Sequence, residues 1–93
     1  MTQTLQATSR PKLPRGVRLK HDEVRGEWLL LAPERVIKTN GVAKAVLERC
    51  SGTLTLQDII ADLAQNFDAP EARIEADVRA LLMALAEKRL LDF

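Results

Sequence analysis

The sequence predicts an α+β fold of the winged helix-turn-helix type, in which a three-stranded antiparallel sheet is followed by three helices. Three short segments between residues 17 and 39 have the apolar content of strands and are separated by turn residues. After residue 40 the apolar spacing changes to the helical period, and each of three segments opens with a helix start signal. A chain of 93 residues is enough for one such domain and too short for two.

The three strands are expected at residues 17–21, 27–31 and 35–39. The first alternates apolar and polar residues, which is typical of a half-buried strand. The second is apolar almost throughout, which indicates a central strand covered on both faces. A tight turn with Pro33 at its second position leads into the third strand. Strands in direct succession form a meander of order 1-2-3, so the third strand should lie at an edge of the sheet.

Start and stop signals define the first two helices. Asn40 is a favourable N-cap for the first helix, and Gly52 can end it in the left-handed conformation. Thr55 and Asp58 resemble a capping box at the start of the second helix. Apolar residues recur with a helical period in each, at Val42, Ala43, Val46, Leu47 and Cys50, and at Leu56, Ile59, Ile60, Leu63, Ala64 and Phe67. Each helix should therefore bury one face.

The third helix is expected to follow an Asp68 cap, with Pro70 in its first turn, and to run to about Lys88. The positive charge at Lys88 suits the C-terminal end of a helix. The predicted core stripe consists of Ile74, Val78, Leu81 and Leu85. The apolar residues beyond the helix should pack back on the domain as an irregular end; these are Leu90, Leu91 and Phe93.

The opening segment differs in composition from the rest of the chain. Residues 1–14 are rich in Thr, Gln, Ser, Lys and Pro and lack apolar periodicity, so we expect a disordered basic tail before a folded domain at residues 15–93. The five bases that precede the first acid are Arg10, Lys12, Arg15, Arg18 and Lys20. They either form a solvated tail or steer a partner by their charge. The remaining core is small, so such a domain could dimerise edge to edge at high concentration.

Charge, cysteine content and the lack of long apolar segments predict where the protein resides. The net charge of +1 gives no electrostatic case for nucleic acid or for an acidic membrane. Cys50 is the single cysteine, which rules out an intramolecular disulfide and favours a reducing compartment. The N-terminus lacks the apolar region of a signal peptide, and the longest apolar run, Ala80–Ala86, is far too short to span a membrane. We therefore expect a soluble cytoplasmic protein.

No set of residues predicts catalysis. His21 stands alone as a polar residue at a strand end, and Cys50 closes the apolar stripe of the first helix, as a core residue does. One His and one Cys cannot form a typical zinc site, and neither a P-loop nor a dinucleotide-binding motif is present. We expect a protein that is not an enzyme and has no cofactor or metal of its own.

A winged-helix fold raises DNA binding as an alternative function. The third helix would enter the major groove, and its charges disfavour this role because acidic side chains repel phosphates. It carries four acids, Glu71, Glu75, Asp77 and Glu87, against three bases, Arg73, Arg79 and Lys88.

Two segments, Lys20–Trp28 and Leu31–Arg35, have a distinctive sequence. Together with Asn40, Ala43, Val46, Leu47, Cys50, Gly52, Ile59, Leu63, Ile74–Val78 and Leu85, they closely resemble the PqqD family of pyrroloquinoline quinone (PQQ) biosynthesis. The resemblance runs from about Arg15 to the C-terminus. The chain departs from the family pattern on both sides of Asn40. The family often has an apolar residue before this Asn and an acidic residue followed by Thr after it, whereas this chain has Thr39 before it and Gly41 and Val42 after it. The first helix should therefore begin less firmly.

The resemblance implies a function that composition does not indicate. Proteins of this family are peptide chaperones that bind the ribosomally made precursor peptide of PQQ. They present it to a radical S-adenosylmethionine (SAM) enzyme, which holds the iron–sulfur clusters and cross-links a Glu and a Tyr of the peptide. In similar recognition domains of other modified-peptide pathways, the leader peptide adds a strand to the third strand, beside the third helix. The partners implied are thus a precursor peptide and a radical SAM enzyme.

The residues expected to bind the peptide lie on two elements. The third strand offers Val36, Ile37, Lys38 and Thr39, because an edge strand leaves backbone N–H and C=O groups unpaired. On the third helix, a stripe that flanks the predicted core would line the groove; it comprises Glu75, Arg79, Leu82 and Ala86, with Leu82 as the apolar anchor. The alternative is a solvated helix face with Leu82 in the core. Because one of the Val36 and Ile37 side chains must face the core, the prediction rests more on the strand backbone than on its side chains.

Overall fold

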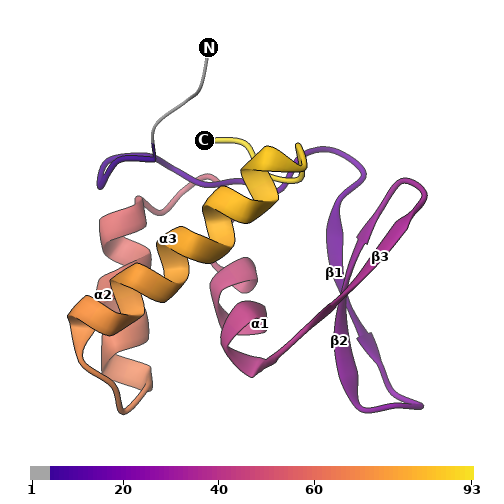
Figure 1. The fold of residues 1–93 in the computed structure, drawn as a ribbon, viewed down its shortest axis with the longest axis horizontal. Coiled ribbons are helices and arrows are strands. Elements are labelled where there is room, and N and C mark those ends of the chain that lie inside the picture. Colours follow the sequence, from indigo (N-terminus) through magenta and orange to yellow (C-terminus); the bar gives the residue numbers. More distant parts are fainter. Residues whose placement is uncertain (1–4) are drawn as a thin grey trace.

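A three-stranded antiparallel sheet precedes three helices in the computed structural model, which describes residues 5–93 (Figure 1). The sheet has the order β1-β2-β3 and is built from β1 (Arg18–Asp22), β2 (Glu27–Ala32) and β3 (Arg35–Thr39). The helices are α1 (Gly41–Glu48), α2 (Leu56–Asn66) and α3 (Glu71–Glu87). The predicted α+β fold class and the meander are therefore confirmed.

The core lies between the helices and one face of the sheet. Helix α1 sits between the sheet and the pair formed by α2 and α3, and it contacts both (Figure 1). The largest fully buried side chains come from every layer; they are Leu30, Leu56, Ile59, Leu63, Leu82, Val46, Val78 and Pro11. Leu90 and Leu91 are also buried, so the predicted packing of the C-terminal end is confirmed for these two residues.

The two faces of the sheet differ in burial. On the inner face Leu30 is fully buried, and its cross-strand neighbours Leu19 and Ile37 pack against the core. On the outer face Leu29 and Leu31 remain partly exposed. The expectation that residues 27–31 are covered on both faces is therefore wrong: β2 is central, as predicted, but the helices lie on one side of the sheet only.

The start signals of the first two helices act as predicted. The Asn40 side chain accepts a hydrogen bond of 2.7 Å from the Ala43 N–H, which satisfies one of the unpaired donors at the start of α1. Thr55 and Asp58 form the capping box of α2, with each side chain accepting a bond from the other residue's backbone N–H. These two caps fix where the chain changes direction before and after α1.

The other two boundaries differ from expectation. Helix α1 ends at Glu48, before Gly52, although Gly52 does have a positive φ of 85°. A side chain there would approach the Lys12 side chain to 3.2 Å, so the glycine makes room for the N-terminal segment. The N-cap of α3 is Pro70 with no side-chain hydrogen bond, so Asp68 does not cap this helix.

The segment before the sheet follows the body of the protein. Leu5 is buried, and the carbonyls of Ala7 and Ser9 accept hydrogen bonds from the first backbone N–H groups of α2 at 3.0 and 2.7 Å. Lys12 exchanges two backbone hydrogen bonds of 2.8 Å with Asp92. Residues 5–14 thus differ from the disordered tail that composition predicts, because they supply acceptors that a helix N-terminus needs. The prediction for residues 1–4 lies outside the described residues.

The helices of the described part are short. The longest, α3, has 17 residues, and none of those described is both long and apolar enough to cross a membrane.

Candidate functional site

Strand β3 lies at one edge of the sheet and pairs with β2 on one side only. Among the described residues no segment pairs with its other side. Five residues of strand extend about 17 Å. This edge is a row of backbone donors and acceptors open to another extended chain.

The hairpin geometry decides which residues of β3 point their backbone outward. The turn has two residues between Ala32 and Arg35, and such a hairpin closes on a hydrogen-bonded pair. Bonded pairs then alternate along the strands, so Ile37 bonds to Leu30 of β2. The N–H and C=O groups of Val36 and Lys38 consequently point to the free edge. Of the four predicted strand residues, only these two offer their backbone to a guest strand.

The last residue of β3 is held by its side chain. The Thr39 hydroxyl donates a hydrogen bond of 2.8 Å to the Trp28 carbonyl on β2. Trp28 is in turn covered by Lys44 of α1, with the ammonium 4.7 Å from the ring centroid, and its ring lies 4.7 Å from that of His21. Thr39 thus fixes the end of the open edge against α1, and its hydroxyl is occupied within the protein.

A groove begins where the open edge ends. Asn40 follows β3 directly, and it forms one wall of a hollow of about 230 Å³ between α1 and α3. The α1 side of this hollow is apolar, and the α3 side combines a carboxylate with an apolar side chain; the lining is Asn40, Val42, Ala43, Val46, Asp77 and Leu81. A chain that leaves the β3 edge past Asn40 would enter this hollow.

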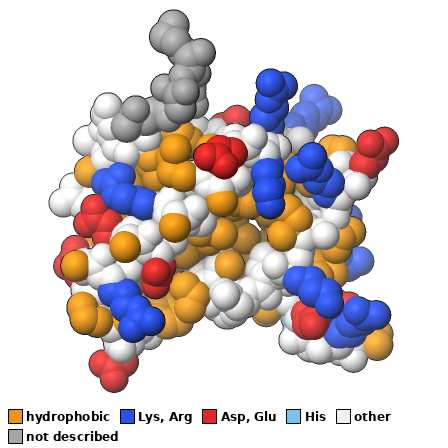
Figure 2. Space-filling model, viewed as in Figure 1, with side chains coloured by type: hydrophobic (Ala, Val, Ile, Leu, Met, Phe, Trp, Pro, Cys, Tyr) orange, Lys and Arg blue, Asp and Glu red, His pale blue; other side chains and the backbone are white. Residues whose placement is uncertain are grey.

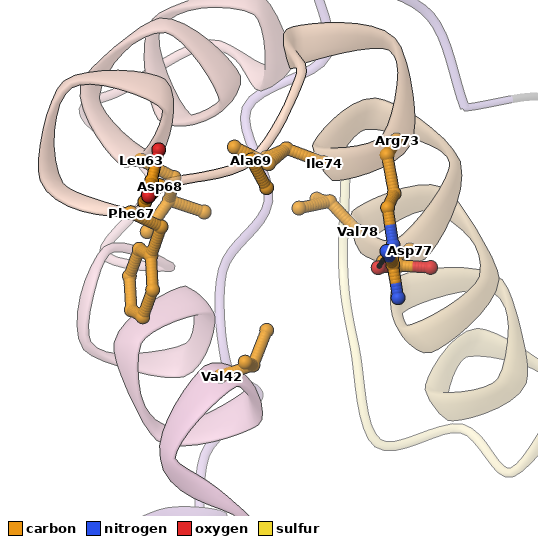
Figure 3. A pocket seen from close by; sticks show the side chains of 9 residues that line it. All are labelled: Val42, Leu63, Phe67, Asp68, Ala69, Arg73, Ile74, Asp77 and Val78. Atoms are coloured by element: carbon orange, nitrogen blue, oxygen red, sulfur yellow. Dashed lines mark ion pairs between the residues drawn. The ribbon is translucent and has the colours of Figure 1, made fainter.

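A second hollow continues the groove toward the end of α2 (Figure 3). It encloses about 290 Å³ and shares Val42 and Asp77 with the first hollow. Its walls are mainly apolar, and Phe67 and Val42 are 37% and 47% exposed. Arg73 and Asp77 form an ion pair of 4.0 Å at its rim. Figure 2 shows hydrophobic side chains in the hollowed middle of this face. The two hollows form one apolar groove along α3 with charged residues at its margin.

The α3 residues predicted to line the groove lie elsewhere. The Arg79 guanidinium donates to Glu75 at 2.9 Å and to the Leu5 carbonyl at 2.8 Å. Both side chains therefore face the N-terminal segment and the start of α2, in a separate hollow that also includes Gln57. Leu82 is fully buried in the core, so it cannot serve as a surface anchor. Burial therefore contradicts Leu82 as a surface anchor, while Glu75 and Arg79 line a hollow other than the one between α1 and α3.

The residues that do face the groove from α3 are Asp77 and Leu81. Sequence reasoning placed Leu81 in the core stripe and Leu82 beside it, and the structure reverses the two. Leu81 and Leu82 are adjacent apolar residues about 100° apart around the helix, so both fit an apolar stripe. The buried set Ile74, Val78, Leu82 and Leu85 has spacings of four, four and three residues, which is an equally good helical period.

The described residues around the edge and the groove provide groups for binding but few reactive side chains. Burial raises the pKa of the Cys50 thiol to about 12, and its Sγ donates to the Val46 carbonyl at 3.3 Å. The thiol is thus protonated and shielded near neutral pH. Among the described residues, no three His, Cys, Asp or Glu side chains converge as metal ligands. The arrangement can hold an extended chain by its backbone and seat apolar side chains beside it.

Comparisons with known proteins agree on one family. The model of the family described as Coenzyme PQQ synthesis protein D (PqqD) matches residues 27–91. The PqqA binding protein of Xanthomonas euvesicatoria pv. vesicatoria is 51% identical over 83 residues, which are 89% of this chain and 90% of that protein.

Two solved structures share the fold and much of the sequence. One is the solution NMR structure of the PqqD truncation of Methylobacterium extorquens PqqCD, described as a functional, stand-alone recognition element for ribosomally synthesised and post-translationally modified peptides. It has a TM-score of 0.83 and 44% identity, over 97% of this chain and 96% of that one. The other is the crystal structure of PqqD from Xanthomonas campestris, with a TM-score of 0.61 and 46% identity over 97% of this chain and 100% of that one.

Proposed function

Because the chain belongs to the PqqD family, we propose that it is a peptide chaperone of PQQ biosynthesis. It binds the ribosomal precursor peptide by strand addition to β3 and presents it to a radical SAM enzyme for the Glu–Tyr cross-link. The name of the Xanthomonas relative, a PqqA binding protein, supports the peptide as ligand. The observation that carries the proposal is the β3 edge, which no described segment covers.

Estimated binding free energies indicate that the peptide needs both the β3 edge and the groove. Val36 and Lys38 offer two donors and two acceptors, and four main-chain hydrogen bonds contribute about 4 kcal/mol at roughly 1 kcal/mol each. A micromolar complex needs about 8 kcal/mol. The ladder by itself is therefore too weak, even before the cost of association is counted. Apolar side chains seated in the groove beside Val42 and Leu81 would supply the remainder at about 2 kcal/mol each.

The alternative function, DNA binding, has little support from the surface of α3. Its first half presents Asp77 toward the groove, and Arg73 is paired with this same carboxylate. Arg79 is occupied by Glu75 and by a backbone carbonyl. Each arginine of the described α3 thus has a carboxylate neighbour, which disfavours contact with a phosphate, and phosphate contacts dominate affinity for nucleic acid.

A titration followed by NMR tests the proposed site. The protein is labelled with ¹⁵N and the unlabelled precursor peptide is added in steps. We expect large amide shifts at residues 35–39 and in the groove at Val42, Asp77 and Leu81. Glu75 and Arg79, on the other side of α3, serve as internal controls and should shift little. Shifts that centre on Glu75 and Arg79, or saturable binding without any change in β3, would contradict strand addition.

A further inference from the structure

The outer face of the sheet carries an apolar strip that the fold does not use. The strand register places Leu29, Leu31 and Val36 on this face, where they border a shallow hollow of about 540 Å³. The remaining lining comes from β1 and the start of the β1–β2 loop, and consists of Lys20, His21, Asp22 and Glu23. Val36 is 65% exposed, and Leu29 and Leu31 are partly exposed. Within the described residues the helices lie against the opposite face, so nothing described covers this strip.

Basic side chains flank the strip on both sides. Along one cross-strand row Leu29 of β2 lies between Lys20 of β1 and Lys38 of β3. In the next row Arg18 stands beside Leu31. The acids of this face, Asp22, Glu23 and Glu27, lie at one end of the strip, at the loop of the β1–β2 hairpin, where Asp22 and Glu23 also line the hollow. The Asp22 carboxylate is engaged there, because it accepts hydrogen bonds from the amides of the hairpin loop at 3.1 and 3.4 Å. The strip is therefore apolar along its centre, positive along its flanks, and acidic only at its end beside the β1–β2 loop.

Strand addition would enlarge this same face. Val36 and Lys38 direct their backbone to the free edge and their side chains to the outer face. A guest strand paired with them becomes the fourth strand of the sheet. Because side chains alternate between the two faces with a period of two, every second residue of the guest would stand on the outer face, next to Val36 and Lys38.

We propose that this outer face, completed by alternate side chains of the bound peptide, is where the peptide-modifying enzyme docks. The docking surface on the enzyme would be an apolar patch bordered by Asp and Glu side chains, which complement the leucines and the basic flanks. This inference rests on the proposed function, and it adds the surface that the enzyme recognises. The peptide occupies the edge and the groove while the enzyme occupies the outer face, so both can bind at once.

The arrangement also couples the two binding events. A peptide that supplies part of the docking surface increases the affinity of the enzyme for the chaperone. By linkage, the enzyme then increases the affinity for the peptide by the same factor. The chaperone loaded with peptide should therefore bind the enzyme more tightly than the empty chaperone does.

Two substitutions on the outer face test the proposal without touching the peptide site. Leu29→Glu places a charge in the centre of the strip, and Lys20→Glu reverses a flanking charge on β1, two strands away from the free edge. Arg10→Glu is the matched control, since Arg10 is an exposed base on the N-terminal segment. Calorimetry gives the affinity for the peptide, surface plasmon resonance gives the affinity of the loaded chaperone for the radical SAM enzyme, and circular dichroism checks folding.

We expect Leu29→Glu and Lys20→Glu to weaken binding of the enzyme at least tenfold, with peptide affinity within twofold of the parent and with Arg10→Glu unchanged in both. Folded, peptide-loaded variants that bind the enzyme like the parent would overturn the docking surface. So would a parent dimer in sedimentation that Leu29→Glu dissociates without affecting the enzyme, since a second copy would then be the occupant. The proposed function fails separately, if the parent does not bind the peptide at all.

Discussion

A proline at Lys38 separates the contribution of the strand edge from that of the fold. The Lys38 N–H points away from β2, so Lys38→Pro removes a donor that only a guest strand uses. Proline is tolerated on an edge strand at such a position. Ile37→Pro would instead break a bond within the sheet, to Leu30. Lys38→Pro should therefore lower peptide affinity and leave stability close to the parent, whereas Ile37→Pro should lower stability.

The expected loss of peptide affinity follows from the hydrogen bond that the Lys38 N–H would donate to the guest strand. Lys38→Pro removes one main-chain bond and leaves the guest carbonyl without a partner, which together cost about 2 kcal/mol, or roughly 30-fold in affinity. Lys38→Ala is the control, because it removes the side chain and keeps the N–H. Calorimetry with the precursor peptide gives both affinities, and thermal melts should show Lys38→Pro close to the parent. If Lys38→Pro binds the peptide as tightly as Lys38→Ala, strand addition at this edge is refuted.

Four further outcomes are expected. Leu81→Ala should weaken peptide binding severalfold and, because Leu81 is also partly buried against the core, lower the melting temperature by less than Leu82→Ala does, whereas Glu75→Ala, on the other side of α3, should leave binding unchanged by calorimetry. Leu82→Ala should cost about 3 kcal/mol of unfolding free energy in urea denaturation, because Leu82 is fully buried; a loss of peptide affinity with unchanged stability would contradict its core position. Leu5→Ala should lower stability by about 2 kcal/mol in the same assay, which a disordered N-terminal segment would not do. For Cys50 the folded pKa of about 12 lies above the unfolded value of 9.0, so its contribution to stability is complete below pH 9 and is lost as pH rises toward 12. A thiol reagent at pH 8 should accordingly label Cys50 only after denaturation.

Local signals in the sequence were sufficient for the order and type of the elements. The period-two and helical apolar patterns, the Asn40 cap and the box of Thr55 and Asp58 act within a few residues, so the structure reproduces them. The prediction of β3 as an edge strand also held, because three strands in direct succession leave the last one outside. The fold class and the open edge were thus determined by the sequence alone.

The tertiary structure decided which surfaces meet. Leu81 and Leu82 are chemically identical neighbours on α3, and only packing against α2 turns Leu82 into the core and Leu81 toward the groove. Leu5 has no periodic partners in sequence, and it is buried because the segment around it supplies carbonyls to the start of α2. The apolar sequence of β2 predicts burial on both faces of the sheet, but the helices cover only one of them. Each of these outcomes depends on contacts between distant segments, which local periodicity does not encode.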